Sequence, residues 1–323
     1  MPFIRRQTAS ELVSLACSFF VVAPVFAAST EPGDWLNRMG AAVQSTSYEG
    51  TVVRIRDGEA EALKVVRTVS DGVVREKLVS QEGNGLEIIR NGKEVHCILP
   101  DRKSVLVEEW NDQSTLFSTL PSSEIRFGSE YDVSIVREDR VAGRQTVLLA
   151  IRPHDGYRYG YRIWLDIETG FPLQTQLIGD DGSAIEQVKF ADVSLNKEIH
   201  ASALAPSYSI ENYRWFNQPA RHVTRAVETD WACENIPRGF RAVSTHEEQL
   251  PGSEKFVTHI LYSDGLANVS VFIAQLEEGS SQGASSVGGS NSYSATVGDY
   301  HVTAVGEVPA MTVEQFATTM SPR

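Results

Sequence analysis

The sequence is poor in cysteine, with three residues in 323, of which Cys17 lies in an apolar N-terminal stretch. The other two, Cys97 and Cys233, fall in different predicted domains, and no Cys or His spacing suggests a zinc site. An oxidising compartment would permit a disulfide. However, Cys97 lies inside an apolar run, where a thiol typically acts as a small buried hydrophobe. We therefore predict no metal site and leave the oxidation of these two thiols open.

Positive charge is also scarce, because 29 Lys and Arg face 42 Asp and Glu and the formal net charge is -13. A nucleic-acid-binding protein needs a basic face to neutralise phosphates, so nucleic acid is excluded as a partner. The acidic excess is concentrated in residues 226–323, with 12 acidic and 4 basic side chains. The segment 206–225 instead carries three Arg and one Glu. Because their net charges are opposite, the two segments could bind different partners, although a solvated charged surface is the simpler alternative.

Long hydrophobic runs are missing after residue 27, since none approaches the ~18 apolar residues that span a bilayer. The one apolar stretch covers residues 12–26, follows Arg5 and Arg6, and ends in small side chains at Ala27. That order is typical of a secretory signal peptide with its cleavage site. We predict that residues 1–27 are a signal peptide and that the protein is exported.

The sequence does not have the patterns of an enzyme. Its seven histidines are scattered, and no Gly-rich phosphate loop opens a helix. Residues 279–283 match the letters of a nucleophile elbow, but they lie in a Gly- and Ser-rich stretch, 278–292, that we expect to be a mobile loop. His154 stands beside Asp155 without a candidate nucleophile. We predict no catalytic residues and no cofactor.

Residues 48–107 dominate the pattern, because short apolar runs alternate there with turn residues at a nearly constant interval. Asp-Gly and Asn-Gly pairs supply the positive φ angles of tight hairpins, and β-branched residues fill the runs between them. The predicted strands of this antiparallel meander are 51–55, 63–67, 73–78, 86–90, 95–99 and 105–107. A single curved sheet or open barrel follows.

The remaining segments predict two domains. An amphipathic helix that Asp34 caps precedes the meander, an aromatic lid covers 110–131, and further strands run to residue 191. After a connector at 206–225, two hairpins and a final helix with a Thr312–Gln315 capping box form a small domain. The predicted fold class is α+β: a large antiparallel half-barrel domain at 28–205 and a small α+β domain at 226–323.

Two surfaces are candidates for binding. A sheet face covered by a helix and a lid is suited to an acyl chain, although an ordinary filled core is an equal alternative. The candidate lipid-binding residues are Val53, Ile55, Cys97, Leu99, Trp110, Phe117 and Phe127. The connector supplies the candidate partner-binding residues, which are Arg214, Trp215, Phe216 and Arg221. Its aromatics either anchor a partner or pack the two domains together.

Several short motifs together resemble the MucB/RseB family of periplasmic sigma-factor regulators. In the first domain they are Trp35-Leu36 with Met39, Tyr48-Glu49-Gly50-Thr51, Glu87-Ile88-Ile89-Arg90, Val95-His96-Cys97 followed by Pro100-Asp101, Val141-Ala142-Gly143-Arg144, and Tyr157-Arg158-Tyr159-Gly160 leading to Trp164-Leu165-Asp166. In the second they are Ser263-Asp264-Gly265-Leu266-Ala267 with Val269-Ser270-Val271-Phe272, and Val305-Gly306-Glu307-Val308-Pro309. The similarity covers essentially the whole chain after the signal peptide.

The resemblance implies a fold and a mechanism. It implies a large domain similar to the lipoprotein carriers LolA and LolB, a small second domain and a periplasmic location. It also implies binding to the periplasmic part of a transmembrane anti-sigma factor, protection of that partner from proteolysis, and release by lipid or lipopolysaccharide; a homodimer is possible. Such release is linkage, since a ligand that binds only the free protein shifts the complex apart. The alternative is a lipid or lipoprotein carrier of the LolA type.

Overall fold

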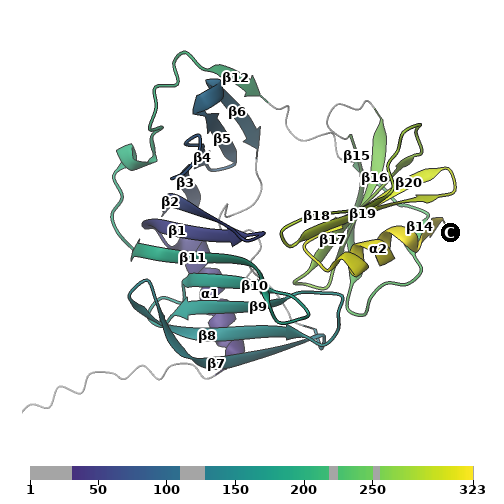
Figure 1. Cartoon of the computed structure of the whole chain (residues 1–323), viewed down its shortest axis with the longest axis horizontal. Coiled ribbons are helices and arrows are strands. Elements are labelled where there is room, and N and C mark those ends of the chain that lie inside the picture. The colour runs from purple at the N-terminus through teal and green to yellow at the C-terminus, as the bar shows by residue number, and fades with distance from the viewer. Residues whose placement is uncertain (1–30, 110–127, 218–224, 250–254, 323) are drawn as a thin grey trace, which may run out of the picture.

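The computed structural model describes residues 31–109, 128–217, 225–249 and 255–322. We call α1 with the 12-stranded sheet the large domain, and α2 with the 7-stranded sheet the small domain (Figure 1). The large domain consists of α1 (Pro32–Ser45), β1 (Tyr48–Arg56), β2 (Glu59–Ser70), β3 (Val73–Ser80), β4 (Glu87–Asn91), β5 (Glu94–Leu99), η1 (Pro100–Arg102), β6 (Ser104–Glu109), β7 (Tyr131–Val141), β8 (Arg144–Pro153), β9 (Gly160–Asp166), β10 (Pro172–Ile178), β11 (Ala184–Leu195), η2 (Ala201–Leu204) and β12 (Arg214–Asn217).

The small domain consists of β13 (Arg225–Ala226), β14 (Trp231–Cys233), β15 (Arg241–Gln249), β16 (Phe256–Ser263), β17 (Asn268–Gln275), β18 (Gly283–Val287), β19 (Ser290–Val297), β20 (Tyr300–Gly306), α2 (Ala310–Thr318) and β21 (Met320–Pro322). The first sheet has the order β12-β6-β5-β4-β3-β2-β1-β11-β10-β9-β8-β7, and the second has the order β13-β15-β16-β17-β20-β19-β18. The predicted α+β class, with a large antiparallel sheet and a small second domain, is confirmed.

The predicted meander is confirmed, because all six predicted runs lie in β1 to β6 and pair in sequence order. Its tightest turns have the expected chemistry. Asp57 and Gly58 have φ angles of 52° and 78°, and Asp71 and Gly72 have 52° and 75°. Positive φ at both central residues matches the twist of the flanking strands. These turns fix the register of strand pairing, and the register decides which sheet face each side chain of the paired strands occupies.

Helix α1 lies against one face of the large sheet and runs behind β7–β11 in Figure 1. Trp35 and Met39 are buried among Leu149, Ile163 and other side chains of β7–β10. The predicted Asp34 cap is wrong, because the N-cap residue is Glu31 and Pro32 opens the first turn. Proline suits that position since its missing N–H would have no helical partner there.

The small domain corrects two predictions. The stretch 278–292 is not a long loop, because β18 and the start of β19 pair within it. A strand therefore follows Gly283, where a nucleophile elbow would need a helix. The Thr312–Gln315 capping box is also wrong: α2 begins after Pro309, and the Thr312 hydroxyl donates instead to the Tyr157 carbonyl of the large domain at 2.8 Å.

No helix among the described residues is long and apolar enough to cross a membrane. Both described cysteines are free. Cys97 is half-buried, and burial, followed by the Glu108 carboxylate, raises the pKa of its thiol to about 11. Cys233 is buried in the small-domain core, where burial likewise raises its pKa. Thiols with raised pKa values are poor nucleophiles near neutral pH.

Candidate functional site

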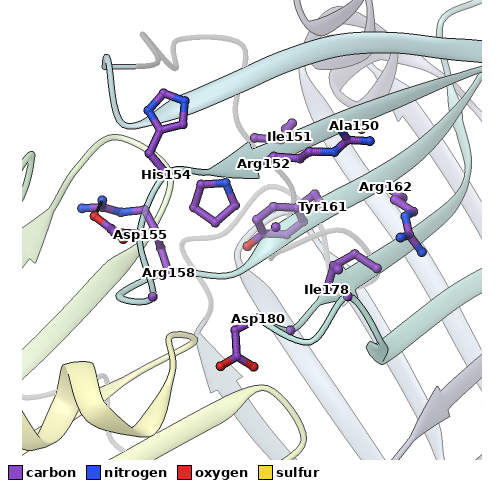
Figure 2. A pocket seen from close by; sticks show the side chains of 15 residues that line it. Ala150, Ile151, Arg152, His154, Asp155, Arg158, Tyr161, Arg162, Ile178 and Asp180 are labelled. Atoms are coloured by element: carbon purple, nitrogen blue, oxygen red, sulfur yellow. Dashed lines mark hydrogen bonds and ion pairs between the residues drawn. The ribbon is translucent and has the colours of Figure 1, made fainter.

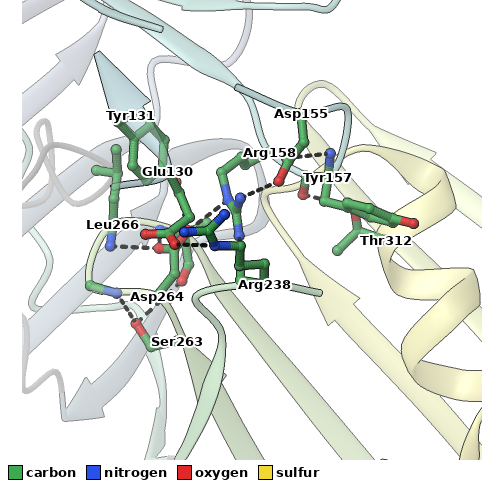
Figure 3. Close-up of polar contacts among 12 residues, drawn as sticks. Glu130, Tyr131, Asp155, Tyr157, Arg158, Arg238, Ser263, Asp264, Leu266 and Thr312 are labelled. Atoms are coloured by element: carbon green, nitrogen blue, oxygen red, sulfur yellow. Dashed lines mark hydrogen bonds and ion pairs between the residues drawn. The ribbon is translucent and has the colours of Figure 1, made fainter. Parts of the chain in front are cut away.

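The two domains meet at a buried polar cluster centred on Arg158, which lies in the connection between β8 and β9 (Figure 3). Its side chain is fully buried and bridges two carboxylates: Nη1 lies 2.5 Å from Asp155 Oδ2, and Nε lies 2.8 Å from Asp264 Oδ2. Nη2 donates to the Arg238 carbonyl at 2.5 Å. Asp264 and Arg238 belong to the small domain. A single guanidinium therefore holds two chain segments of the small domain against the large one.

Asp264 is fixed by its own turn before it meets Arg158. Its Oδ1 accepts the N–H groups of Leu266 at 2.9 Å and Ala267 at 2.7 Å, as an aspartate does in an Asx turn. Its Oδ2 also accepts the Tyr131 hydroxyl at 2.8 Å. Burial, followed by the Asp264 carboxylate, raises the pKa of Tyr131 far above its ordinary value, so the phenol remains a donor. Both oxygens of the Asp264 carboxylate therefore have partners.

Apolar and cationic contacts complete this interdomain joint. The Arg158 guanidinium lies over the rings of Tyr131 and Phe240, at 5.5 Å and 4.9 Å from their centroids. Leu266, from the turn after β16, packs against the large-domain core that contains Leu149 and Ile163. A desolvated cation over aromatic faces gains more than an exposed one. The interdomain joint therefore combines buried ion pairs, cation–π contacts and apolar packing.

A second interdomain contact lies at the β18–β19 turn. The N–H of Gly288 donates to Asp57 Oδ2 at 3.1 Å, and that of Gly289 donates to Glu186 Oε1 at 2.9 Å. Asn291 Nδ2 donates to the Tyr159 hydroxyl at 3.0 Å. A Cβ at Gly289 would collide with the Leu177 side chain. A larger residue at this position would therefore displace the Leu177 side chain, and the neighbouring Gly288 has a positive φ of 57° that favours glycine.

The protonation of Glu307 determines how the stability of this second contact depends on pH. Burial, with the neighbouring Glu186 carboxylate adding to it and Arg56 opposing, raises the pKa of Glu307 to about 7 from an ordinary 4.5. The folded state holds this proton more tightly than the unfolded state, so the associated stability is full below pH 4.5 and is lost as pH rises towards 7. We expect Glu307→Gln to abolish this decline. Urea unfolding of both proteins from pH 4.5 to 8 checks it, and an unchanged slope in the variant would contradict it.

A cavity of about 530 Å³ adjoins the joint, at the end of the β8–β9 hairpin (Figure 2). Tyr161 lies in its middle, with Arg152 and Arg162 towards one end and Asp155 and Arg158 towards the other. Its volume is within the range of small-molecule sites. None of the four predicted lipid-binding residues that the structure describes, Val53, Ile55, Cys97 and Leu99, lines it. Asp155 and Arg158 belong both to the lining of this cavity and to the interdomain joint.

The predicted lipid-binding residues are not brought to one face. Cys97 lies opposite Ile88, which lies opposite Leu78 and through it Val65 and Gly50, in a row on the sheet face that bears Tyr48 and α1. Alternation along β5 puts Leu99 on that face too. Alternation along β1 puts Val53 and Ile55 on the opposite face from Tyr48. Trp110, Phe117 and Phe127 lie outside the described residues, as does most of the predicted lid.

Of the predicted partner-binding residues, three form β12 and the fourth, Arg221, lies outside the described residues. The side chains of Trp215 and Phe216 are each 47% exposed, so they do not pack the domains together. Strand β12 pairs in parallel with β6 and ends the described sheet. The Trp215 ring meets the His96 ring edge-on at 5.3 Å. Two exposed aromatics therefore stand on an edge strand.

Both domains match family models. Residues 31–208 match the MucB/RseB N-terminal domain, and residues 225–321 match the MucB/RseB C-terminal domain. The chain belongs to the MucB/RseB family. It is 31% identical over 300 residues to the sigma factor AlgU regulatory protein MucB of Pseudomonas aeruginosa, covering 91% of this chain and 92% of MucB. It is 25% identical over 294 residues to the sigma-E factor regulatory protein RseB of Escherichia coli K12, covering 90% of each chain.

The fold likeness to MucB extends over both domains. A crystal structure of MucB in complex with MucA(peri) matches with a TM-score of 0.67 and 30% identity, over 91% of this chain and 99% of MucB. A crystal structure of MucB matches with a TM-score of 0.60 and 29% identity, over 91% of this chain and 99% of that one. The predicted membership of the MucB/RseB family is confirmed.

Sequence reasoning missed the joint of this MucB/RseB protein. Arg158 and Asp264 occur in two of the motifs that carry the family resemblance, but 106 positions separate them (264 minus 158) and nothing in either motif indicates the other. The usable signal was local. An Asp followed by Gly-Leu-Ala predicts an Asx turn that buries its carboxylate, and a buried carboxylate requires a cation.

Proposed function

We propose that this protein is a periplasmic regulator that binds the periplasmic part of a transmembrane anti-sigma factor and shields it from proteolysis. Lipid or lipopolysaccharide then weakens the complex, so that the sigma factor is released. The observation that carries the proposal is the likeness over both domains to MucB solved with MucA(peri). Membership of the MucB/RseB family supports it, as does the similarity to MucB and RseB, which are sigma-factor regulatory proteins.

We infer that β12 forms part of the anti-sigma-factor surface. An edge strand offers backbone groups to which an extended peptide can add, and side-chain pockets beside it give specificity. Arg214, Trp215 and Phe216 occupy this strand and are all exposed. Tryptophan and arginine are the residues most often found where binding energy concentrates. The acidic small domain and the basic connector suit different parts of such a peptide.

The Trp215→Ala variant is expected to bind the anti-sigma-factor segment about 30-fold more weakly, because truncating a central aromatic anchor costs about 2 kcal/mol. Phe256→Ala is the matched control. Phe256 is a similarly exposed aromatic, at 50%, on β16 of the small domain. Calorimetric titration of the three proteins measures the effect. Equal affinities for wild type and Trp215→Ala would exclude β12 from the surface.

The whole proposal is tested by calorimetric titration of residues 28–323 with the periplasmic segment of the anti-sigma factor from the same organism, with and without lipopolysaccharide. Tight binding that lipopolysaccharide weakens supports a regulator released by lipid. Tight binding that lipopolysaccharide leaves unchanged supports a regulator and excludes this release signal. Lipid uptake without peptide binding would instead make the protein a carrier of the LolA type, the alternative that the sequence leaves open.

A further inference from the structure

Two histidines and a glutamate meet on the small-domain sheet, far from the interdomain joint. His246 and Glu248 lie on β15, and His259 lies on β16 directly opposite His246. Residues two apart on a strand share a face, so Glu248 joins the same side. This side is the one opposite Ile260 and Tyr262, which belong to the core beneath α2. Antiparallel pairing thus collects three metal-ligand side chains on one sheet face.

The three potential ligand atoms converge on one point. His246 Nε2 lies 3.2 Å from Glu248 Oε2 and 3.1 Å from His259 Nδ1, and His259 Nδ1 lies 3.7 Å from Glu248 Oε2. Ligands about 2.0 to 2.1 Å from a tetrahedral zinc ion are separated from one another by about 3.3 to 3.4 Å. The observed separations straddle this value. The triangle is therefore already the size of one face of a zinc tetrahedron.

Hydrogen bonding alone does not account for this convergence. A neutral His246 has at most one proton on Nε2, yet both the Glu248 carboxylate and His259 Nδ1 lie within hydrogen-bond distance of that atom. A cation at the centre would satisfy all three atoms at once.

Neighbouring side chains fix the positions of the three potential ligands but leave them partly exposed to solvent. The His259 ring stacks on Phe272 at 4.4 Å between centroids, which fixes one ligand from below. The side chains of His246, Glu248 and His259 remain 23%, 19% and 15% exposed. Two imidazoles and one carboxylate form a donor set that zinc accepts with a fourth, exchangeable ligand. Partial exposure leaves room for that ligand.

We propose that His246 Nε2, Glu248 Oε2 and His259 Nδ1 bind one Zn²⁺ ion, with the fourth coordination position open to water or to a side chain of a bound partner. The sequence indicates no metal site here, because the two histidines are 13 positions apart and only the β15–β16 pairing makes them neighbours. Their separation matches no helical ligand spacing. The proposal is independent of anti-sigma-factor binding.

The test uses the tag-free chain 28–323, treated with a chelator and then titrated with Zn²⁺ in competition with a fluorescent zinc indicator. We expect one equivalent to bind. His246→Ala and Glu248→Gln are each expected to weaken binding by at least about 100-fold, since even residues that only orient a ligand cost 10- to 100-fold. The control is His154→Ala, because His154 is exposed and faces only Asp132, at 3.1 Å. Its affinity should equal that of wild type.

Cobalt gives a readout that does not depend on the variants. Co²⁺ in a four-coordinate site absorbs visible light much more strongly than six-coordinate Co²⁺, so titration of the wild-type chain should produce the intense spectrum and Zn²⁺ should abolish it. Circular dichroism confirms that Glu248→Gln, which keeps the side-chain shape, is folded. Failure of the wild-type chain to bind Zn²⁺, or equal binding by Glu248→Gln, would overturn the proposal.

Discussion

Replacing Arg158 with alanine is expected to lower the free energy of unfolding by about 3 to 5 kcal/mol, because it removes one partner from a buried ion pair and leaves the others uncompensated. Asp264 is 7% exposed as a residue and would keep its turn but lose its cation. Asp155 would lose a contact of 2.5 Å. Urea unfolding measures the loss. Small-angle scattering should show a larger radius of gyration, since interdomain motion follows when an interface is weakened.

Arg152→Ala is the matched control, because Arg152 is an exposed arginine near the end of β8, just before the same connection. Its stability should remain close to that of wild type. Asp264→Asn adds a second test: an asparagine Oδ1 can still accept the N–H groups of Leu266 and Ala267, whereas Nδ2 in place of Oδ2 can neither accept from Tyr131 nor pair with Arg158. Equal stability of Arg158→Ala and Arg152→Ala would show that the joint contributes nothing to holding the domains together.

The strands were predictable because their signals are local. Asp57-Gly58 and Asp71-Gly72 demand a turn with positive φ, and the β-branched runs beside them have no competing helical pattern. The β18–β19 hairpin was not predictable in the same way. Its residues are mostly Gly and Ser, and β19 is held by its pairing with β20 and by Tyr293, Ala295 and Val297, which pack against the small-domain core. The β18–β19 hairpin therefore depends on its tertiary contacts more than on the composition of its own residues.

The candidate sites depend on pairing at long range, which explains why sequence reasoning found few of them. Trp215 and Phe216 were identified because large aromatics in a polar connector are unusual. The zinc triangle and the Arg158 joint involve partners on different strands or domains, and no periodic pattern links such residues. Val53 and Cys97 show the same limit: each lies in a clear strand, but the face that each one occupies depends on the whole register.

A second buried ion pair leads to the other large effect, which concerns how α1 is held over the sheet. Arg67 and Glu76 have side chains that are 1% and 0% exposed, with Nη1 3.7 Å from Oε1. Arg67 Nη2 also donates to the Val43 carbonyl of α1 at 2.9 Å, and the Tyr48 hydroxyl donates to Glu76 at 3.3 Å. Glu76→Leu is expected to cost about 3 to 5 kcal/mol, because it leaves Arg67 charged and buried. Chemical denaturation measures this cost.

The double variant Arg67→Met, Glu76→Leu should recover part of that loss, since apolar residues of similar volume often replace a buried ion pair at little cost. What remains is the unmet Val43 carbonyl and the unmet Tyr48 hydroxyl, each worth about 1 to 3 kcal/mol. The exposed pair Lys255–Glu277 is the control, and Glu277→Leu should leave stability unchanged within error. If the double variant were as unstable as Glu76→Leu, the loss would come from packing and not from the stranded charge. Recovery would instead show that the loss in Glu76→Leu comes from the uncompensated charge of Arg67, which lies against the end of α1.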